Sequence, residues 1–81
     1  MTSEDKLHKD IYDIISGQFL IPKENITAVL GPGDLDNWDS IGHLQLVRKL
    51  EQHFNVSFTV PDVMSFDTVK DIYDTIKKLL A

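Results

Sequence analysis

Apolar residues recur at helical spacing near the start of the chain. The stripe advances by four, three and one residue, through Leu7, Ile11, Ile14 and Ile15. Intervals of three and four residues place side chains on one face of a helix. The segment Ser3-Glu4-Asp5 supplies a capping serine and two first-turn acids, and Gly17 marks the end of the stripe. The pattern predicts a first helix over about residues 3–17.

A second amphipathic stripe predicts a helix from about Ser40 to Phe54. Its inward face carries Leu46, Val47, Leu50 and Phe54, and His43 joins them in the first turn. The roughly opposite face carries Ile41, Gln45, Arg48 and Gln52. Ile41 is therefore an apolar side chain that points outward, one residue after Ser40.

The last third of the chain contains the clearest helical pattern. The stripe that carries it consists of Val69, Ile72, Tyr73, Ile76 and Leu80. We expect Asp67 to cap this helix, and residues 61–64 to form one short helical turn that begins at Pro61. Residues 56–60 alternate as a strand would, but a single strand has no partner, so an extended linker is predicted.

A long connection over residues 22–39 separates the first two helices. Four apolar side chains are expected to pin it to the core: Ile26, Val29, Leu30 and Leu35. Residues 25–27 are predicted to form a single turn. Loops of this length are more often functional than accidental. The predicted fold is all-α, a small four-helix bundle of three long helices and one short helix, with a long loop between helices 1 and 2.

Size and charge restrict the functions that the chain can have. Its 81 residues predict one domain over 1–81, with room for a modest core but not for a deep catalytic cleft as well. Thirteen acidic against eight basic side chains argue against a nucleic-acid partner. No apolar stretch is long enough to span a membrane and the start lacks the order of a signal peptide, so a cytoplasmic protein is expected. No cysteine is present, which excludes disulfides and thiolate metal sites.

Asp39-Ser40 lies where the second helix begins, after a loop rich in glycine and aspartate. The first amide groups of a helix lack intrahelical partners and the helix dipole is positive there, so an anion is well placed. The position therefore suits a phosphate carried on the Ser40 oxygen. Asp and Ser also favour helix starts everywhere, so an equally simple interpretation is that Ser40 is only a helix cap.

Other chemistry finds less support in the sequence. Asp34, Asp36 and Asp39 fail the calcium-loop template at three positions. The histidines do not cluster, no metal site is predicted, and His43 is interpreted as a packed, neutral side chain. Ser40 and His43 have no walls around them to exclude water, so no hydrolase is predicted. Trp38 is interpreted as a core plug for the loop, with an exposed docking ring as the alternative.

Together these residues resemble an acyl carrier protein of the phosphopantetheine-attachment family. The resemblance covers nearly the whole chain and is strongest over residues 35–54. The matching positions are Asp39-Ser40-Ile41, Leu44, Leu46-Val47, Leu50-Glu51 and Phe54, and the helix entry over residues 65–69 also fits.

The resemblance implies a discrete carrier rather than an enzyme. Ser40, supported by Asp39 and a transient Mg²⁺, would receive 4'-phosphopantetheine from coenzyme A through a phosphopantetheinyl transferase. The arm's thiol would hold acyl or aminoacyl groups for loading and transferring enzymes, and a monomer is expected. The partner-contact residues would be Ile41, Leu44, Arg48 and Trp38. A possible acyl pocket, which on sequence is equally well a filled core, would be lined by Leu46, Leu50, Phe58, Val63, Phe66 and Ile72; it would suit short or polar cargo.

One departure from the family pattern concerns charge. Carrier proteins of fatty-acid synthesis usually show a run of acids along helix two, whereas residues 41–54 here contain Arg48 and Lys49 against only Glu51. Charge complementarity selects partners. A specialised fatty-acid, polyketide or aminoacyl pathway is therefore predicted, including a carrier of D-alanine or another amino acid. The alternative of a different class is an unmodified helical interaction module in which Ser40 is only a cap.

Overall fold

The computed structural model describes the backbone of residues 3–81 and the side chains of residues 6–81. The chain forms α1 (Ser3–Phe19), the 3₁₀ turn η1 (Lys23–Asn25), α2 (Ser40–Phe54), α3 (Val60–Met64) and α4 (Val69–Leu80). No strand occurs within residues 3–81. Three long helices and one short helix confirm the predicted all-α bundle. The predicted cap Ser3 and the acids after it lie outside the described side chains.

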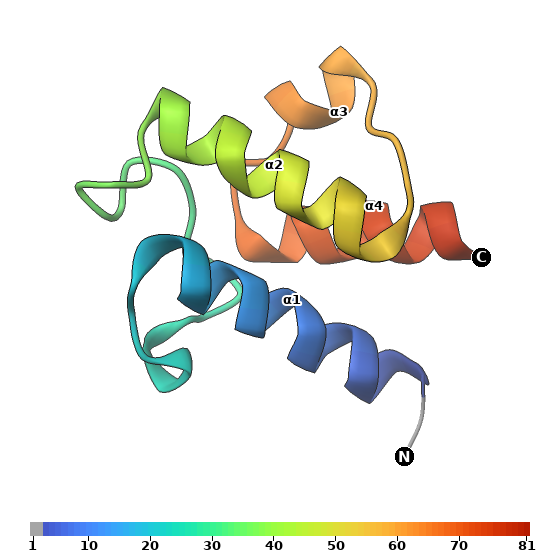
Figure 1. Cartoon of the computed structure of the whole chain (residues 1–81), viewed down its shortest axis with the longest axis horizontal. Coiled ribbons are helices and arrows are strands. Elements are labelled where there is room, and N and C mark those ends of the chain that lie inside the picture. Colours follow the sequence, from blue (N-terminus) through green and yellow to red (C-terminus); the bar gives the residue numbers. More distant parts are fainter. Residues whose placement is uncertain (1–2) are drawn as a thin grey trace.

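The helices enclose one hydrophobic core. Figure 1 shows α1 and α2 running in opposite directions along the molecule, with α4 beside them and α3 next to α2. The buried apolar side chains come from all three long helices and from the connections: Leu7, Ile11, Ile15, Phe19, Ile26, Trp38, Leu46, Val47, Leu50, Phe66, Val69, Ile72 and Ile76. Burial of such side chains is the main stabilising term for a domain of this size.

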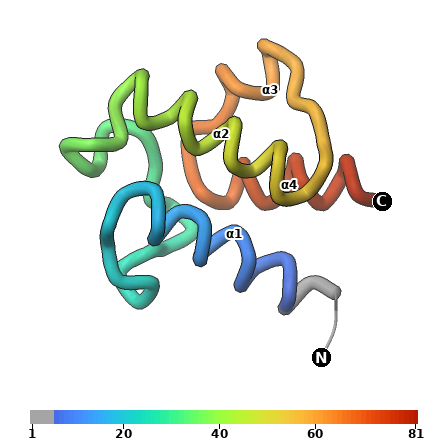
Figure 2. The backbone as a smooth tube through the Cα atoms, in the orientation of Figure 1, coloured from blue at the N-terminus to red at the C-terminus, as the bar shows by residue number. Residues whose placement is uncertain are grey.

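The first connection lies across the end of the bundle where α2 and α4 begin, as the backbone trace in Figure 2 shows. Ile26 is buried, and Leu30 and Leu35 pack partly against the core, as predicted. Val29 was expected there as well, which is wrong, because its side chain is 77% exposed. Backbone pairing holds this part of the loop instead: the Leu30 and Ala28 carbonyls accept hydrogen bonds from α4.

Four element boundaries differ from the prediction, the smallest difference being at α3, which begins at Val60 rather than at Pro61. Helix α1 continues past Gly17 to Phe19, and Leu20 then turns into the left-handed region with φ 57°. The single turn in the loop is η1, two residues earlier than expected, directly after Pro22. Helix α4 is capped by Thr68 rather than Asp67, because Thr68 and Asp71 form a reciprocal capping box.

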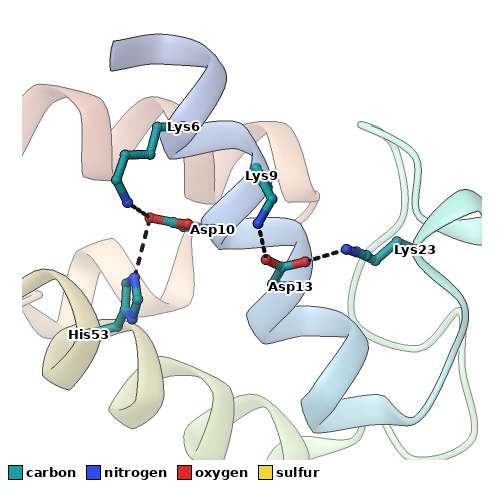
Figure 3. A network of polar contacts seen from close by, with 6 residues as sticks. All are labelled: Lys6, Lys9, Asp10, Asp13, Lys23 and His53. Atoms are coloured by element: carbon teal, nitrogen blue, oxygen red, sulfur yellow. Dashed lines mark hydrogen bonds and ion pairs between the residues drawn. The ribbon is translucent and has the colours of Figure 1, made fainter. Parts of the chain in front are cut away.

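A polar network joins α1 to its neighbours (Figure 3), made by Lys6, Lys9, Asp10, Asp13, Lys23 and His53. Asp13 lies 2.7 Å from the Lys23 ammonium of η1 and 3.1 Å from that of Lys9. These two contacts hold the pKa of the Asp13 carboxyl below its ordinary value of 3.8, and the hydrogen bond with Lys23 has the larger effect. The network fastens η1 to α1 without entering the core.

None of the helices within the described residues is both long enough and apolar enough to cross a membrane.

Candidate functional site

The start of α2 is capped by Asp39, not by Ser40. The Asp39 Oδ1 atom accepts a hydrogen bond of 2.8 Å from the Gly42 amide, and the Asp39 carbonyl accepts one of 2.8 Å from the His43 amide. Ser40 is the first helical residue and is exposed. The interpretation of Ser40 as only a helix cap is therefore wrong, because its neighbour already performs that task.

The hydroxyl and two amides at this helix start have no partner in the part of the chain that the structure describes. Among the described residues, nothing accepts or donates a hydrogen bond at the Ser40 hydroxyl, and nothing accepts from the Ser40 and Ile41 amides. Two free N–H groups and the positive end of the helix dipole thus lie next to the serine oxygen. A phosphodiester formed on that oxygen would meet donors that the fold leaves unused.

Trp38, two residues before Ser40, anchors this helix start to the core. Its side chain is fully buried and stacks on the Phe19 ring at 4.5 Å. The Asn37 side-chain amide also donates a bond of 2.9 Å to the Phe19 carbonyl. The alternative in which Trp38 is an exposed docking ring, and with it the prediction of a partner contact, is wrong, because a buried ring cannot face a partner. Trp38 is the predicted core plug.

His43 links this support to α3. The Trp38 Nε1–H group donates to His43 Nδ1 at 3.0 Å, so that nitrogen carries no proton. The proton of the neutral ring is then on Nε2, which donates to the Val63 carbonyl at 3.3 Å. His43 is half-buried and each ring nitrogen has a hydrogen-bond partner, in agreement with the predicted packed histidine.

Gly42 allows the loop backbone at Asn37 and the Phe19 ring to lie close against the first turn of α2. A Cβ atom at this position would overlap the Asn37 carbonyl oxygen and lie 3.1 Å from the Phe19 ring. Any larger residue would push the helix start away from the loop that carries Asp39. The glycine is therefore part of what holds the Ser40 backbone in place.

The outward face of α2 is exposed as predicted. Ile41 and Leu44 are 70% and 60% exposed, and Arg48 is exposed beyond them. Together with Gln45 these side chains line a hollow of about 160 Å³. The structure thus brings three of the four predicted contact residues onto one surface beside Ser40. Their contact with partners remains a prediction.

Two exposed apolar residues of α3 were missed. Val60 and Met64 are 72% and 78% exposed on this short helix, whose Val63 carbonyl meets His43 of α2. A helix of five residues is too short to show an amphipathic period, so no sequence pattern indicates that these two side chains are exposed.

The residues of the predicted acyl pocket lie inside the bundle. Leu46, Leu50, Phe66 and Ile72 are buried in the core, whereas Phe58 and Val63 are partly buried against it. The Phe58 and Phe66 rings meet edge to face at 5.2 Å. The six side chains thus belong to the core or pack against it, and the opening of a pocket among them remains a prediction.

The side chains of residues 6–81 contain no cluster of three or more His, Cys, Asp or Glu that could hold a metal ion.

Comparison with known proteins gives two matches. Residues 38–76, which include the start of α2, match the family described as "Phosphopantetheine attachment site". The chain is also 40% identical over 68 residues to the acyl carrier protein of Syntrophobacter fumaroxidans (strain DSM 10017 / MPOB). That alignment covers 84% of this chain and 84% of the relative.

Proposed function

Because the chain belongs to the acyl carrier protein family, whose covalent cofactor is 4'-phosphopantetheine, we propose that Ser40 is the attachment residue. One observation carries the proposal: Asp39 caps α2, so the exposed Ser40 hydroxyl and two helix amides are left without partners among residues 3–81. The attached group supplies a flexible arm that ends in a thiol, which can hold an acyl or aminoacyl group as a thioester.

Attachment requires a phosphopantetheinyl transferase, coenzyme A and Mg²⁺. The Ser40 Oγ atom forms a bond to the phosphorus next to the pantetheine part of coenzyme A. The bond from that phosphorus to the bridging oxygen breaks, adenosine 3',5'-bisphosphate leaves, and the hydroxyl proton passes to a base of the enzyme. The new phosphodiester would lie beside the Ser40 and Ile41 amides, which have no partner among the described residues, and the neighbouring Asp39 carboxylate would assist the Mg²⁺ ion.

The chain acts as a carrier rather than as a catalyst. The serine lies on an exposed helix start with no surrounding wall to exclude water, and the protein contains no cysteine of its own. The reactive sulfur is therefore supplied by the cofactor. The rigid support that Trp38 and His43 build under α2 suits an anchor point for a swinging arm.

A mass measurement tests the attachment. The protein is incubated with coenzyme A, Mg²⁺ and a broad-specificity phosphopantetheinyl transferase, and a gain of one phosphopantetheine group is expected. The Ser40→Ala variant should show no gain. If the parent protein gains no mass, the proposal fails and an unmodified interaction module takes its place.

The charge on α2 supports a specialised acyl, polyketide or aminoacyl pathway. Arg48 and Lys49 are both exposed, Glu51 is the one acid of α2, and the nearest acids before and after this helix lie in the first loop and along α3 and α4. A partner that docks on Ile41, Leu44 and Arg48 therefore needs an acidic group opposite the guanidinium, whereas a basic partner would be repelled.

Turnover by a housekeeping fatty-acid ketosynthase tests this assignment. We expect the acylated protein to be a poor substrate, with kcat/KM at least about tenfold below that of a carrier with an acidic second helix. Arg48→Glu should improve turnover, and Gln52→Glu, one turn further from Ser40, should change it less. Efficient turnover of the parent protein would rule out the specialised pathway while leaving the carrier function intact.

A further inference from the structure

Leu20 combines two features that folding does not explain. It follows the last residue of α1 with φ 57°, in the left-handed region, where its amide and that of Ile21 close the helix on the Ser16 carbonyl. Its side chain is 86% exposed, the highest value among the large apolar residues described. Left-handed backbone favours glycine or asparagine, and an exposed leucine gains nothing from the core.

The end of α2 shows the ordinary solution to the same problem. Asn55 takes the left-handed position there, with φ 54°, and its amide binds the Glu51 carbonyl. Asparagine tolerates this conformation and is polar, so it suits an exposed helix end. Leu20 is strained and apolar where a residue like Asn55 would serve the fold better. Strain of this kind points to a function for the side chain.

The end of α1, directly before Leu20, is fastened to the residues that precede Ser40. The Phe19 carbonyl accepts the bond from Asn37, and the Phe19 ring stacks on Trp38, two residues before Ser40. On the preceding turn, the Gln18 side chain donates a hydrogen bond of 2.9 Å to Gln45 of α2. The end of α1 is thus bound to the first turns of α2, and the exposed apolar residue Leu20 directly follows the last residue of α1.

We propose that Leu20 is a docking contact for the phosphopantetheinyl transferase that modifies Ser40. The inference rests on the proposed function and adds to it a contact outside α2. An enzyme that brings a phosphorus atom to the Ser40 oxygen must cover the surface around that oxygen. The end of α1 adjoins this surface, and the apolar side chain that it exposes there is Leu20.

The charges around the junction describe the enzyme surface that fits. Asp34, Asp36 and Asp39 are exposed in the loop that leads to Ser40. A complementary surface therefore has an apolar patch opposite Leu20 and basic side chains opposite these acids. The apolar part of such a contact persists when salt screens the ionic part.

Loading rates of matched variants test the contact. Leu20→Gly and Leu20→Asn remove the apolar side chain. Both new residues tolerate the left-handed backbone better than leucine, so the Tm of each variant should be equal to or higher than that of the parent. The kcat/KM of a broad-specificity transferase should fall about tenfold, the value expected for losing a buried leucine contact. The loss should remain at 0.5 M NaCl. Leu20→Met, which stays apolar, should load within about twofold of the parent.

Val29 supplies the control, because it is 77% exposed in the same connection but lies at the loop segment that pairs with α4. Val29→Asn should load at the parental rate. Unchanged loading of Leu20→Gly, or an equal loss in Val29→Asn, would overturn the docking contact. Failure of the parent protein to gain any mass would instead overturn the proposed function, and the contact with it.

Discussion

The starts of α2 and α4 have the same sequence chemistry but opposite outcomes. Residues 38–41 read Trp-Asp-Ser-Ile and residues 66–69 read Phe-Asp-Thr-Val, an aromatic residue, an aspartate, a hydroxyl residue and a β-branched residue. Both aromatic side chains are buried. At α2 the aspartate is the cap and the hydroxyl residue is the first of the helix, whereas at α4 the hydroxyl residue is itself the cap.

The difference follows from the residue three positions after the hydroxyl. After Thr68 that residue is Asp71, whose carboxylate accepts hydrogen bonds from the Thr68 and Asp67 amides while its own amide donates to the threonine oxygen. After Ser40 it is His43, which cannot close such a box and binds Trp38 and Val63 instead. The cap at α2 therefore moves back by one residue, to Asp39.

The remaining amides differ as well. At α4 the Val69 amide donates to the Leu30 carbonyl at 2.7 Å and the Lys70 amide donates to the Ala28 carbonyl at 3.0 Å. The matching Ser40 and Ile41 amides at α2 have no partner within the described residues. The first amides of α4 are thus hydrogen-bonded within the fold, whereas the matching amides of α2 remain available to a ligand; we call the start of α2 open in this sense. A hydroxyl near a helix start is free for modification only where another residue takes the cap.

The largest effect on stability is expected from the two caps. Asp39→Ala and Thr68→Ala should each lower the free energy of unfolding by about 1 kcal/mol, within the range of about 0.5–2 kcal/mol for lost caps. Ser40→Ala should change it by less than about 0.5 kcal/mol, because the hydroxyl stabilises nothing. Urea unfolding followed by circular dichroism measures all three. A loss in Ser40→Ala as large as that in Thr68→Ala would show that the serine is a cap after all.

A smaller effect is expected from the ion pairs of α1, which touch neither helix start. The lowered pKa of Asp13 means that the folded state favours its ionised form. This stabilisation is present above pH 3.8 and is lost as the pH falls through the lowered folded value. Because the side chains are exposed, Asp13→Asn should lower the Tm at pH 7 by only about 2 °C or less. The Tm difference should shrink as the pH falls below 3.8. Thermal unfolding at pH 7 and at strongly acidic pH measures it, and equal differences at the two pH values would contradict the prediction.

Much of the fold could be read from the chain because the relevant signals are periodic. The stripe over residues 40–54 fixed both ends of α2, and the stripe of α4 gave its buried Val69, Ile72 and Ile76. Single positions in loops were less certain. Val29 is apolar but exposed, because the backbone of its neighbours, not its side chain, holds the loop to α4.

The candidate site, whose role remains a proposal, could be located from the sequence, but its geometry could not. Ser40 could be found from its motif, whereas the choice between Asp39 and Ser40 as the cap required the geometry of the first turn. The capping box of Thr68 and Asp71 was visible in the sequence as a hydroxyl followed by an acid three residues later. The strained backbone of Leu20 was not visible, because no sequence rule places a leucine in the left-handed region.

The intact mass of three proteins after incubation with coenzyme A, Mg²⁺ and a phosphopantetheinyl transferase tests the difference between the two helix starts most directly. The parent protein and Thr68→Ala should each gain one phosphopantetheine group, and fragmentation should place it on Ser40, while Ser40→Ala gains none. A group found on Ser40→Ala, or a parent protein that stays unmodified while Thr68 and Ser40 variants behave alike, would contradict the assignment of the open start of α2 as the attachment site.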